Sequence, residues 1–303
     1  MTDSRQALKV PAGWILAALV MGALFAGSST LFVRLNELGP ITSAFYRVFL
    51  ALPVLWFAMG WETRAAATVP PRALAPCDYG MLALAGLFFA GDLFFWHLAI
   101  MNTAVANATL LATLAPVYVT AILFVLFRER VRPLFLGGTA LAVAGAALLM
   151  GDSFAFRPDR LLGDVYGLIT GLFLAGYMVT VGRLRQRAGI GTGTLMFWST
   201  LATAAALLPL ALVLEDRMLA GTLFGWAMLA ALALVSHVAG QGLVAMAMAH
   251  LPTAFASVGL IMEVVAAAVL GWAFLNEPLA PLQWLGAAVV VAGVVVARGG
   301  SRT

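Results

Sequence analysis

Ten apolar segments, each long enough to cross a lipid bilayer, follow one another along this chain and constrain its fold more than any other feature. A helix needs about 20 apolar residues to span a hydrocarbon core of roughly 30 Å. Hydropathy places the segments at residues 13–33, 41–60, 79–100, 104–127, 133–151, 162–182, 193–214, 222–249, 253–275 and 281–298. The sequence therefore predicts an all-α polytopic membrane protein with ten transmembrane helices.

The composition excludes a soluble fold. Of the 303 residues, 63% are hydrophobic and only 10% are charged, whereas about 25% are charged in a soluble domain. Arg5 and Lys9 precede the first apolar run, as in a secretory signal, but the run is too long for a signal and nine more follow. We therefore interpret it as a retained first span. No soluble domain is expected at either end.

The chain also contains an internal repeat. The segments that begin at Pro133 and Pro281 share a pattern of small and apolar residues at the same offsets, and the matched pairs include Glu129 with Glu277, Gly138 with Gly286, and Gly145 with Gly293. A second match joins Gly22, Ala26, Gly27, Arg34 and Leu35 to Gly171, Ala175, Gly176, Arg183 and Leu184. A repeat at half the chain length predicts two homologous units, residues 1–151 and 162–303, joined by a linker at residues 152–161.

Basic residues predict the orientation of the spans, because cytoplasmic loops are enriched in Lys and Arg. If the chain starts inside, the cytoplasmic segments hold Arg5, Lys9, Arg64, Arg72, Arg128, Arg130, Arg132, Arg183, Arg185, Arg187, Arg298 and Arg302. The outer segments then hold Arg34, Arg157, Arg160 and Arg217. Both termini are therefore expected to be cytoplasmic. Since each unit has five spans, the second unit is expected to be inverted, which is the plan of secondary transporters that work by alternating access.

Motifs for other chemistry are missing from the sequence. There is no GxxxxGK[ST] phosphate loop, no HExxH and no second cysteine beside Cys77, so we expect no catalysis, no metal, no cofactor and no disulfide. The net charge of +4 comes from arginines spread between apolar runs, which form no basic face for nucleic acid.

Ionisable residues inside the spans are the main candidates for a substrate site, because an unpaired charge in the membrane costs several kcal/mol. Glu263 lies in the middle of the ninth span, and either couples substrate or protons or bonds a neighbouring helix. Asp92 shares a helix face with Phe89 and Trp96, a combination that suits an ammonium group. Arg47 either pairs with a carboxylate or binds the carboxylate of a substrate.

Other polar and aromatic residues in the spans are weaker candidates. His237 and Gln241 lie one helical turn apart, but without a third ligand they form a poor metal site. Packing is the favoured interpretation for His237, Gln241, Asn107 and Tyr177. The candidate binding residues in this group are Tyr46, Asn107, Tyr177, Trp198, His237 and Gln241. Glu129 and Glu277, at span ends, are expected to anchor turns or gates. His97 is expected either to lie near the outer interface or to bond a backbone carbonyl.

The whole chain resembles the EamA-type drug/metabolite transporter superfamily. The resemblance rests on ALFAGSSTLFVR near the start, LLATLAPVYVTAILFVLFRERV in the fourth span and SVGLIMEVVAAAVLGWAFLNEPL in the ninth. Pro116 and Glu129 match the family pattern in the first unit, and Glu263 and Glu277 match it in the second, where Val264 replaces the usual proline. FFWHLAI and the aromatic spans look closest to the YddG-type amino-acid exporters, which implies an inner-membrane exporter with a cavity between the units.

These features together predict an exporter of amino acids, aromatic or other apolar ones such as methionine, in a bacterial cytoplasmic membrane. Its partners would be the small-molecule substrate, the lipid bilayer and, for an antiporter, protons. Three alternatives remain open at this point: an exporter of lipophilic drugs, a carrier of phosphorylated metabolites, and a membrane enzyme or scaffold. A phosphate carrier would need at least two cations in its cavity, and only Arg47 is well placed.

Overall fold

The computed structural model describes residues 11–65, 74–103, 105–150, 160–186, 190–275 and 278–301, and in these parts the chain forms helices and no strand. Ten helical segments are long and apolar enough to cross a membrane, which confirms the ten predicted spans. They are Ala12–Leu35, Pro40–Arg64, Pro76–Asn102, Asn107–Phe127, Pro133–Met150, Leu161–Gln186, Thr192–Leu214, Leu223–Ala247, Thr253–Phe274 and Pro281–Ser301. Most of the linker at residues 152–161 lies outside the described residues, and so does Glu277.

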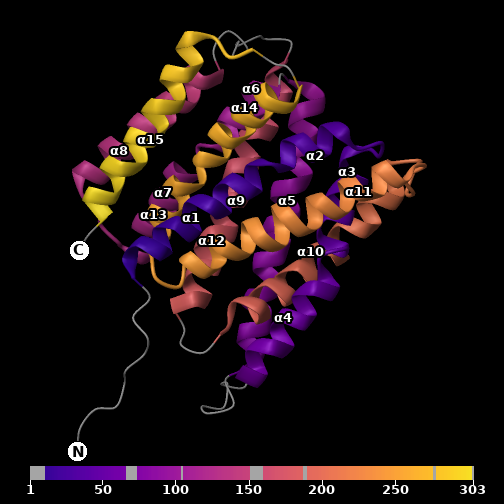
Figure 1. Cartoon of the computed structure of the whole chain (residues 1–303). Helices are drawn as coiled ribbons and strands as arrows, with labels where there is room; N and C mark the ends of the chain where they lie inside the picture. Colours follow the sequence, from indigo (N-terminus) through magenta and orange to yellow (C-terminus); the bar gives the residue numbers. More distant parts are fainter. Residues whose placement is uncertain are drawn as a thin grey trace, which may run out of the picture.

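Half of the spans are single helices and half are interrupted (Figure 1). The single helices are α5 (Pro76–Asn102), α8 (Pro133–Met150), α9 (Leu161–Gln186), α10 (Thr192–Leu214) and α15 (Pro281–Ser301). The interrupted spans are α1 (Ala12–Gly27) with α2 (Ser29–Leu35), α3 (Pro40–Phe49) with α4 (Leu52–Ala65), α6 (Val105–Ala112) with α7 (Ala115–Phe127), and α13 (Thr253–Leu260) with α14 (Met262–Leu275). The eighth span consists of α11 (Leu223–Ala231), the π-helix η3 (Leu232–Gln241) and α12 (Gly242–Ala247).

The interruptions in the fourth and ninth spans lie 148 residues apart, which is the spacing of the predicted repeat. In the fourth span the helix breaks at Thr113 and Leu114, and Pro116 is the second residue of the helix that follows. The ring nitrogen of a proline carries no hydrogen to donate. In the ninth span it breaks at Ile261, where tight bonds link the Ile261 amide to the Val258 carbonyl (3.1 Å) and the Val264 amide to the Ile261 carbonyl (3.1 Å). The second break thus forms with Val264 in place of the proline that the resemblance implies.

α8 and α15 lie against each other with almost no side chain between them. A Cβ placed on Gly138 would clash with Ala297, and one on Gly286, the predicted repeat partner of Gly138, would clash with Leu149. In the same way, a Cβ on Gly145 would clash with Val290, and one on Gly293 would clash with Ala142, so each contact recurs with α8 and α15 exchanged. Small residues let membrane helices approach this closely and gain van der Waals contact.

Two glutamates join the second span to α10 at both ends of the pair. The Glu215 carboxylate, just after α10, accepts hydrogen bonds from the amides of Ile41 (2.6 Å) and Thr42 (3.1 Å) at the start of α3. The Glu62 carboxylate, near the end of α4, accepts bonds from the amides of Gly193 (2.8 Å) and Thr194 (3.3 Å) at the start of α10. The second span and α10 therefore each supply the carboxylate that caps the N-terminus of the other.

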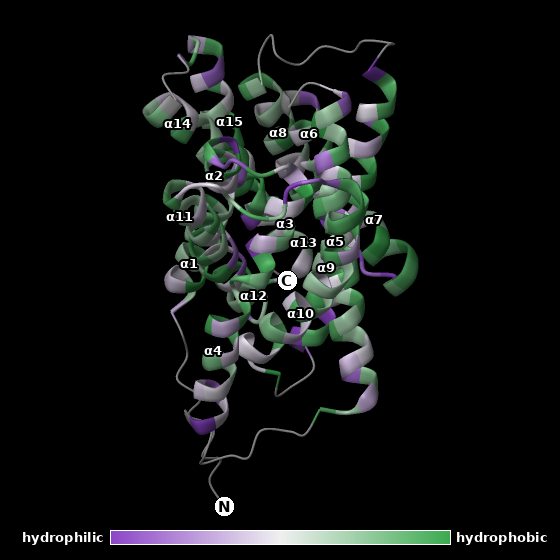
Figure 2. Ribbon diagram, turned by 90° about the vertical axis from the view of Figure 1, so that its right-hand side faces the viewer, coloured by the Kyte–Doolittle hydropathy of each residue, from purple (hydrophilic) through white to green (hydrophobic). Residues whose placement is uncertain are grey.

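The outside of the bundle is apolar, as a lipid-facing surface must be. Figure 2 shows hydrophobic residues along the helices and hydrophilic residues mainly at their ends, with a few inside the bundle. Large side chains such as Trp56, Phe57 and Val213 are exposed on the described surface. The start of α1 and the end of α15 lie at the same end of the bundle (Figure 1).

Candidate functional site

A cavity of about 120 Å³ lies in the interior of the bundle, and residues from both halves of the chain line it. The first half contributes residues of α1, α2, α3, α5, α6 and α7. The second half contributes residues of α9, η3, α13 and α14. The breaks at Thr113 and Ile261 both open onto this cavity, so the interrupted helices place their ends at its wall.

Three ionisable side chains face the cavity: Arg47 from α3, Asp92 from α5, and Glu263 from the first turn of α14. Within the described part of the chain, neither carboxylate has a hydrogen-bond or ion-pair partner. Arg47 is 9% exposed, and its Nε atom has no acceptor. Glu263 and Asp92 are close enough to attract its charge, but no nitrogen–oxygen distance among the three is within 4.0 Å. Two negative groups and one positive group are therefore available to a ligand.

Aromatic and aliphatic side chains form the remaining walls. Phe89 lies with its ring centre 5.7 Å from the Arg47 guanidinium carbon, a cation–π contact that partly offsets the burial of the charge. Tyr177 and His237 lie behind Phe89, with ring centres 5.0 and 5.4 Å away. Trp96 also lines the cavity. A ligand with charged ends and an apolar body would fit such a lining.

The π-helix η3 brings Gln241 to the cavity. Gln241 is 5% exposed, and its Oε1 atom has no hydrogen-bond partner. His237 lies one turn earlier, and its Nε2 atom is 2.9 Å from the Thr200 hydroxyl, while its Nδ1 atom has no partner. π-Helical turns often occur at functional sites. Among the described residues no group of three His, Cys, Asp or Glu side chains could hold a metal.

The predicted site residues separate into two groups. Arg47, Phe89, Asp92, Trp96, Gln241 and Glu263 line the cavity. The others do not: Tyr46 packs on Trp226 (ring centres 5.2 Å apart), Trp198 on Tyr79 (5.1 Å), and Tyr177 and His237 lie behind Phe89. The His97 Nδ1 atom lies 2.5 Å from the Leu93 carbonyl, so the backbone bond is the one of the two expected alternatives that the structure contains.

Asn107 belongs to a separate buried cluster around Asp164, a residue that the sequence did not single out. The Asp164 Oδ1 atom accepts hydrogen bonds from the Thr103 hydroxyl (2.8 Å) and the Asn107 amide (3.2 Å). Asp164 is 7% exposed although it lies in the first turn of α9. The sequence did not indicate that Asp164 is buried, because Asp164 lies beside the linker and a carboxylate at a span end usually reaches water.

Glu129, a predicted turn or gate anchor, forms an ion pair with Arg183 of α9 at 2.6 Å. The Arg183 guanidinium lies over the Phe127 ring at 3.6 Å. Glu62 and Glu215, whose bonds join the second span to α10, were missed as anchors. Their matching positions at the ends of the second and seventh spans were the signal that could have revealed them.

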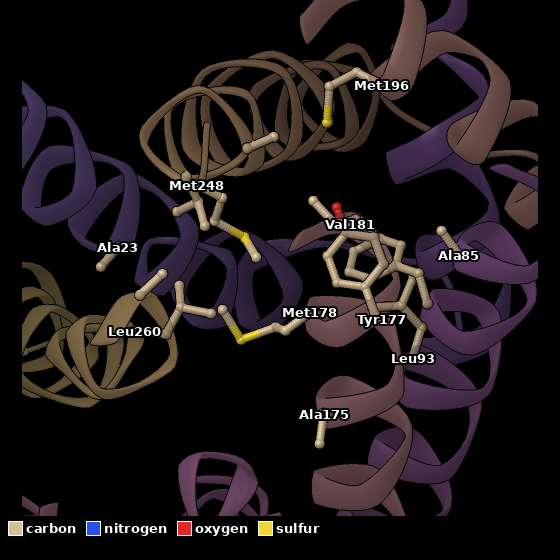
Figure 3. Close-up of a cluster of buried hydrophobic side chains, with 14 of the residues drawn as sticks. Ala23, Ala85, Leu93, Ala175, Tyr177, Met178, Val181, Met196, Met248 and Leu260 are labelled. Carbon is tan, nitrogen blue, oxygen red and sulfur yellow. The ribbon is translucent and has the colours of Figure 1, made fainter. Parts of the chain in front are cut away.

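A buried apolar layer borders the cavity, since Met178 and Leu260 belong to the layer and also line the cavity. Figure 3 shows Met178, Met248 and Leu260 pointing toward one another from α9, the turn after α12, and α13. Val181 and Met196 extend this layer, and all five side chains are at most 7% exposed. The layer separates the cavity from the end of the bundle where α9 ends and α13 begins.

Sequence and structure comparisons place this architecture among known transporters. The model of the EamA-like transporter family matches residues 12–151 and 161–299. An uncharacterized transporter of Archaeoglobus fulgidus is 28% identical over 93% of this chain and 95% of its own length. The pseudopaline exporter CntI of Pseudomonas aeruginosa is 28% identical over 75% of this chain and 78% of its own length. A solved structure with 20% identity superposes with a TM-score of 0.77 over 96% of this chain and 98% of that one, and it shares the fold. The chain is a membrane transporter and belongs to the EamA-like family of the drug/metabolite transporter superfamily.

Proposed function

We propose that this transporter exports small zwitterions of the amino-acid type across a bacterial cytoplasmic membrane. The observation that carries the proposal is the set of charges without a counter-charge in the central cavity: among the described residues Asp92 and Glu263 have no hydrogen-bond or ion-pair partner, and Arg47 has no carboxylate within ion-pair distance. The ammonium of a zwitterion would bind a carboxylate and its carboxylate would bind Arg47. Phe89 and Trp96 would contact an apolar or aromatic side chain. Similarity to an exporter of pseudopaline supports export as the direction.

Alternating access between two inverted repeats is the mechanism we propose. The contacts between α8 and α15 support it, because each contact recurs with the two helices exchanged, as two-fold symmetry requires. The two glutamate caps between the second span and α10 exchange in the same way. In this state the apolar layer around Met178 closes one end of the cavity, and opening that end while the other closes would move the substrate across.

The site also supports proton coupling. A zwitterion neutralises one carboxylate and the guanidinium, and a second carboxylate remains in the cavity without a partner. Protonation of that carboxylate would keep the loaded site neutral, which lowers the cost of moving it through the membrane. Glu263 is the better candidate for the proton, since it sits at the break between α13 and α14, where helix movement would change its access to water.

Transport by purified protein in liposomes tests the proposal. We expect the wild type to move labelled methionine or phenylalanine, and Arg47→Gln and Asp92→Asn each to reduce flux at least about tenfold, because each leaves a buried charge of the ligand or site unpaired. Glu263→Gln should also reduce flux, because it removes the carboxylate that would carry the proton. Asp216→Asn, an exposed change between α10 and α11, is the matched control and should retain the flux. Transport of a lipophilic cation with no amino-acid flux would instead favour the drug-exporter alternative.

The coupling ion needs a second measurement on the same liposomes. With an imposed pH gradient, the wild-type flux should respond to the gradient, and the residual flux of Glu263→Gln should not. A wild-type flux that ignores the gradient would leave the substrate site intact but would contradict proton coupling.

A further inference from the structure

A groove of about 540 Å³ lies between α7 and α8, on the outer surface of the bundle. It exists because these consecutive helices pack against different partners: α8 lies against α15, whereas α7 contacts α9 and α13. Val117 and Phe124 of α7 and Leu136 of α8 line the groove and are 48%, 58% and 48% exposed. The groove therefore opens toward lipid and is separate from the central cavity.

The walls of the groove are apolar. Its two threonines do not present free hydroxyls, because Thr120 donates to the Pro116 carbonyl (2.8 Å) and Thr139 donates to the Phe135 carbonyl (2.9 Å). Bonds of this kind satisfy the hydroxyl within its own helix. The groove contains one charged side chain, Arg130, at the end where the connection between the helices lies.

Local structure leaves Arg130 without a counter-charge. α7 ends at Phe127, and the next residue, Arg128, has a left-handed conformation (φ 57°). The Glu129 amide donates a hydrogen bond to the Leu123 carbonyl at 3.1 Å, which fixes the start of the connection. The Glu129 carboxylate pairs with Arg183 of α9 instead. In the described chain Arg130 has no ion-pair partner, and Arg128 and Arg132 beside it are exposed.

We infer that this groove binds one anionic phospholipid, with an acyl chain along α7 and α8 and the headgroup phosphate at Arg130. From Phe127 to Val117 the helix rises about 15 Å, which is half of the roughly 30 Å hydrocarbon core and matches the chains of one leaflet. Basic pockets between spans bind anionic headgroups through their phosphates. Under the proposed orientation this is the cytoplasmic leaflet.

Lipid retention by the purified transporter tests the inference by native mass spectrometry, with phosphatidylglycerol and phosphatidylcholine carrying identical acyl chains. We expect the wild type to retain phosphatidylglycerol in preference. Arg130→Gln should weaken this retention about fivefold, as the loss of about 1 kcal/mol from one arginine implies. Arg132→Gln is the matched control on the same connection, outside the groove, and should change retention less than twofold.

A second variant tests the groove itself rather than the charge. Ala121→Trp, an exposed position in the groove wall, should reduce retention of both lipids while size-exclusion profiles stay unchanged. Equal retention of the two lipids by the wild type, equal effects of Arg130→Gln and Arg132→Gln, or full retention by Ala121→Trp would each overturn the inference. Displacement of phosphatidylglycerol by millimolar inorganic phosphate would do so too, because it would make the site one for free anions.

Discussion

Arg47 shows at the residue scale how this chain keeps a charge inside the membrane. The side chain is buried in α3, and Phe89 covers one face of the guanidinium. The attraction of Asp92 and Glu263 acts on it from across the cavity, without an ion pair. A direct ion pair between Arg47 and one of these carboxylates would neutralise both groups and leave neither available to bind a ligand. Because a guanidinium binds a carboxylate through two parallel hydrogen bonds, Arg47 is suited to hold the carboxylate end of a substrate.

Glu37 provides a residue-scale prediction outside the spans. Its carboxylate accepts bonds from the Thr222 hydroxyl and from the Gly221 amide at 2.9 Å, before the start of α11. The Thr222 bond, followed by the Gly221 bond and the charge of Arg217, holds the pKa of Glu37 below its ordinary value of 4.5. A pKa lower in the folded than in the unfolded protein means that the stabilisation is present above pH 4.5 and is lost as the pH falls through the folded value.

Thermal unfolding of detergent-solubilised protein measures this effect. At pH 7 the Glu37→Gln variant should unfold at a slightly lower temperature than the wild type, because the group is exposed and screened by solvent. The difference should shrink as the pH falls below 4.5. A difference that stays constant from pH 7 to pH 3 would show that the ionised carboxylate is not the cause. Thr222→Val should reproduce most of the loss at pH 7.

At the scale of elements, the pairing of the second span with α10 leads to the next prediction. Glu62 and Glu215 each place a negative charge on the amides at a helix N-terminus, which is worth about 1 kcal/mol. Glu62→Gln and Glu215→Gln should each lower the free energy of unfolding by about that amount. The caps lie at opposite ends of the helix pair, so the double variant should lose the sum.

Denaturant titration in mixed micelles measures these losses, with Asp216→Asn as the control. Asp216 neighbours Glu215 and is exposed, so its neutralisation changes the charge at the same place without removing a cap. A loss for Asp216→Asn as large as for Glu215→Gln would attribute the effect to surface charge and contradict the capping role. A double variant no worse than either single variant would contradict independent caps.

The elements also show where the sequence was sufficient and where it was not. Hydropathy located all ten spans, because a run of about 20 apolar residues forms a membrane-spanning helix in a bilayer. It could not show the breaks at Ser28 or Ile261, nor the π-helix η3, because these depend on neighbours far along the chain. Ser28, for example, lies 3.0 Å from the Ser236 hydroxyl, between two spans distant in sequence.

The residues of the candidate site also divide into those that the sequence could indicate and those that it could not. Arg47, Asp92 and Glu263 could be found from sequence alone, since charge in an apolar span is rare and has few structural uses. Tyr46 and Trp198 do not line the cavity, and the sequence could not show this, because an aromatic residue on a helix gives no sign of which neighbour it will meet. Asp164 was missed for the opposite reason: nothing in its local sequence shows that Thr103 and Asn107 bury it.

At the scale of the whole molecule, the proposed orientation gives the last prediction, and the single cysteine tests it. Cys77 is exposed at the start of α5. If the chain starts in the cytoplasm, the third span begins there too, so a membrane-impermeant thiol reagent should leave Cys77 unlabelled in intact cells and label it in inside-out vesicles. In a Cys77→Ser background, Asp216→Cys after α10 should show the reverse. Labelling of Cys77 from outside would show that the orientation is the reverse of the predicted one. The groove with Arg130 would then lie in the outer leaflet, and the apolar layer around Met178 would lie on the outer side of the cavity.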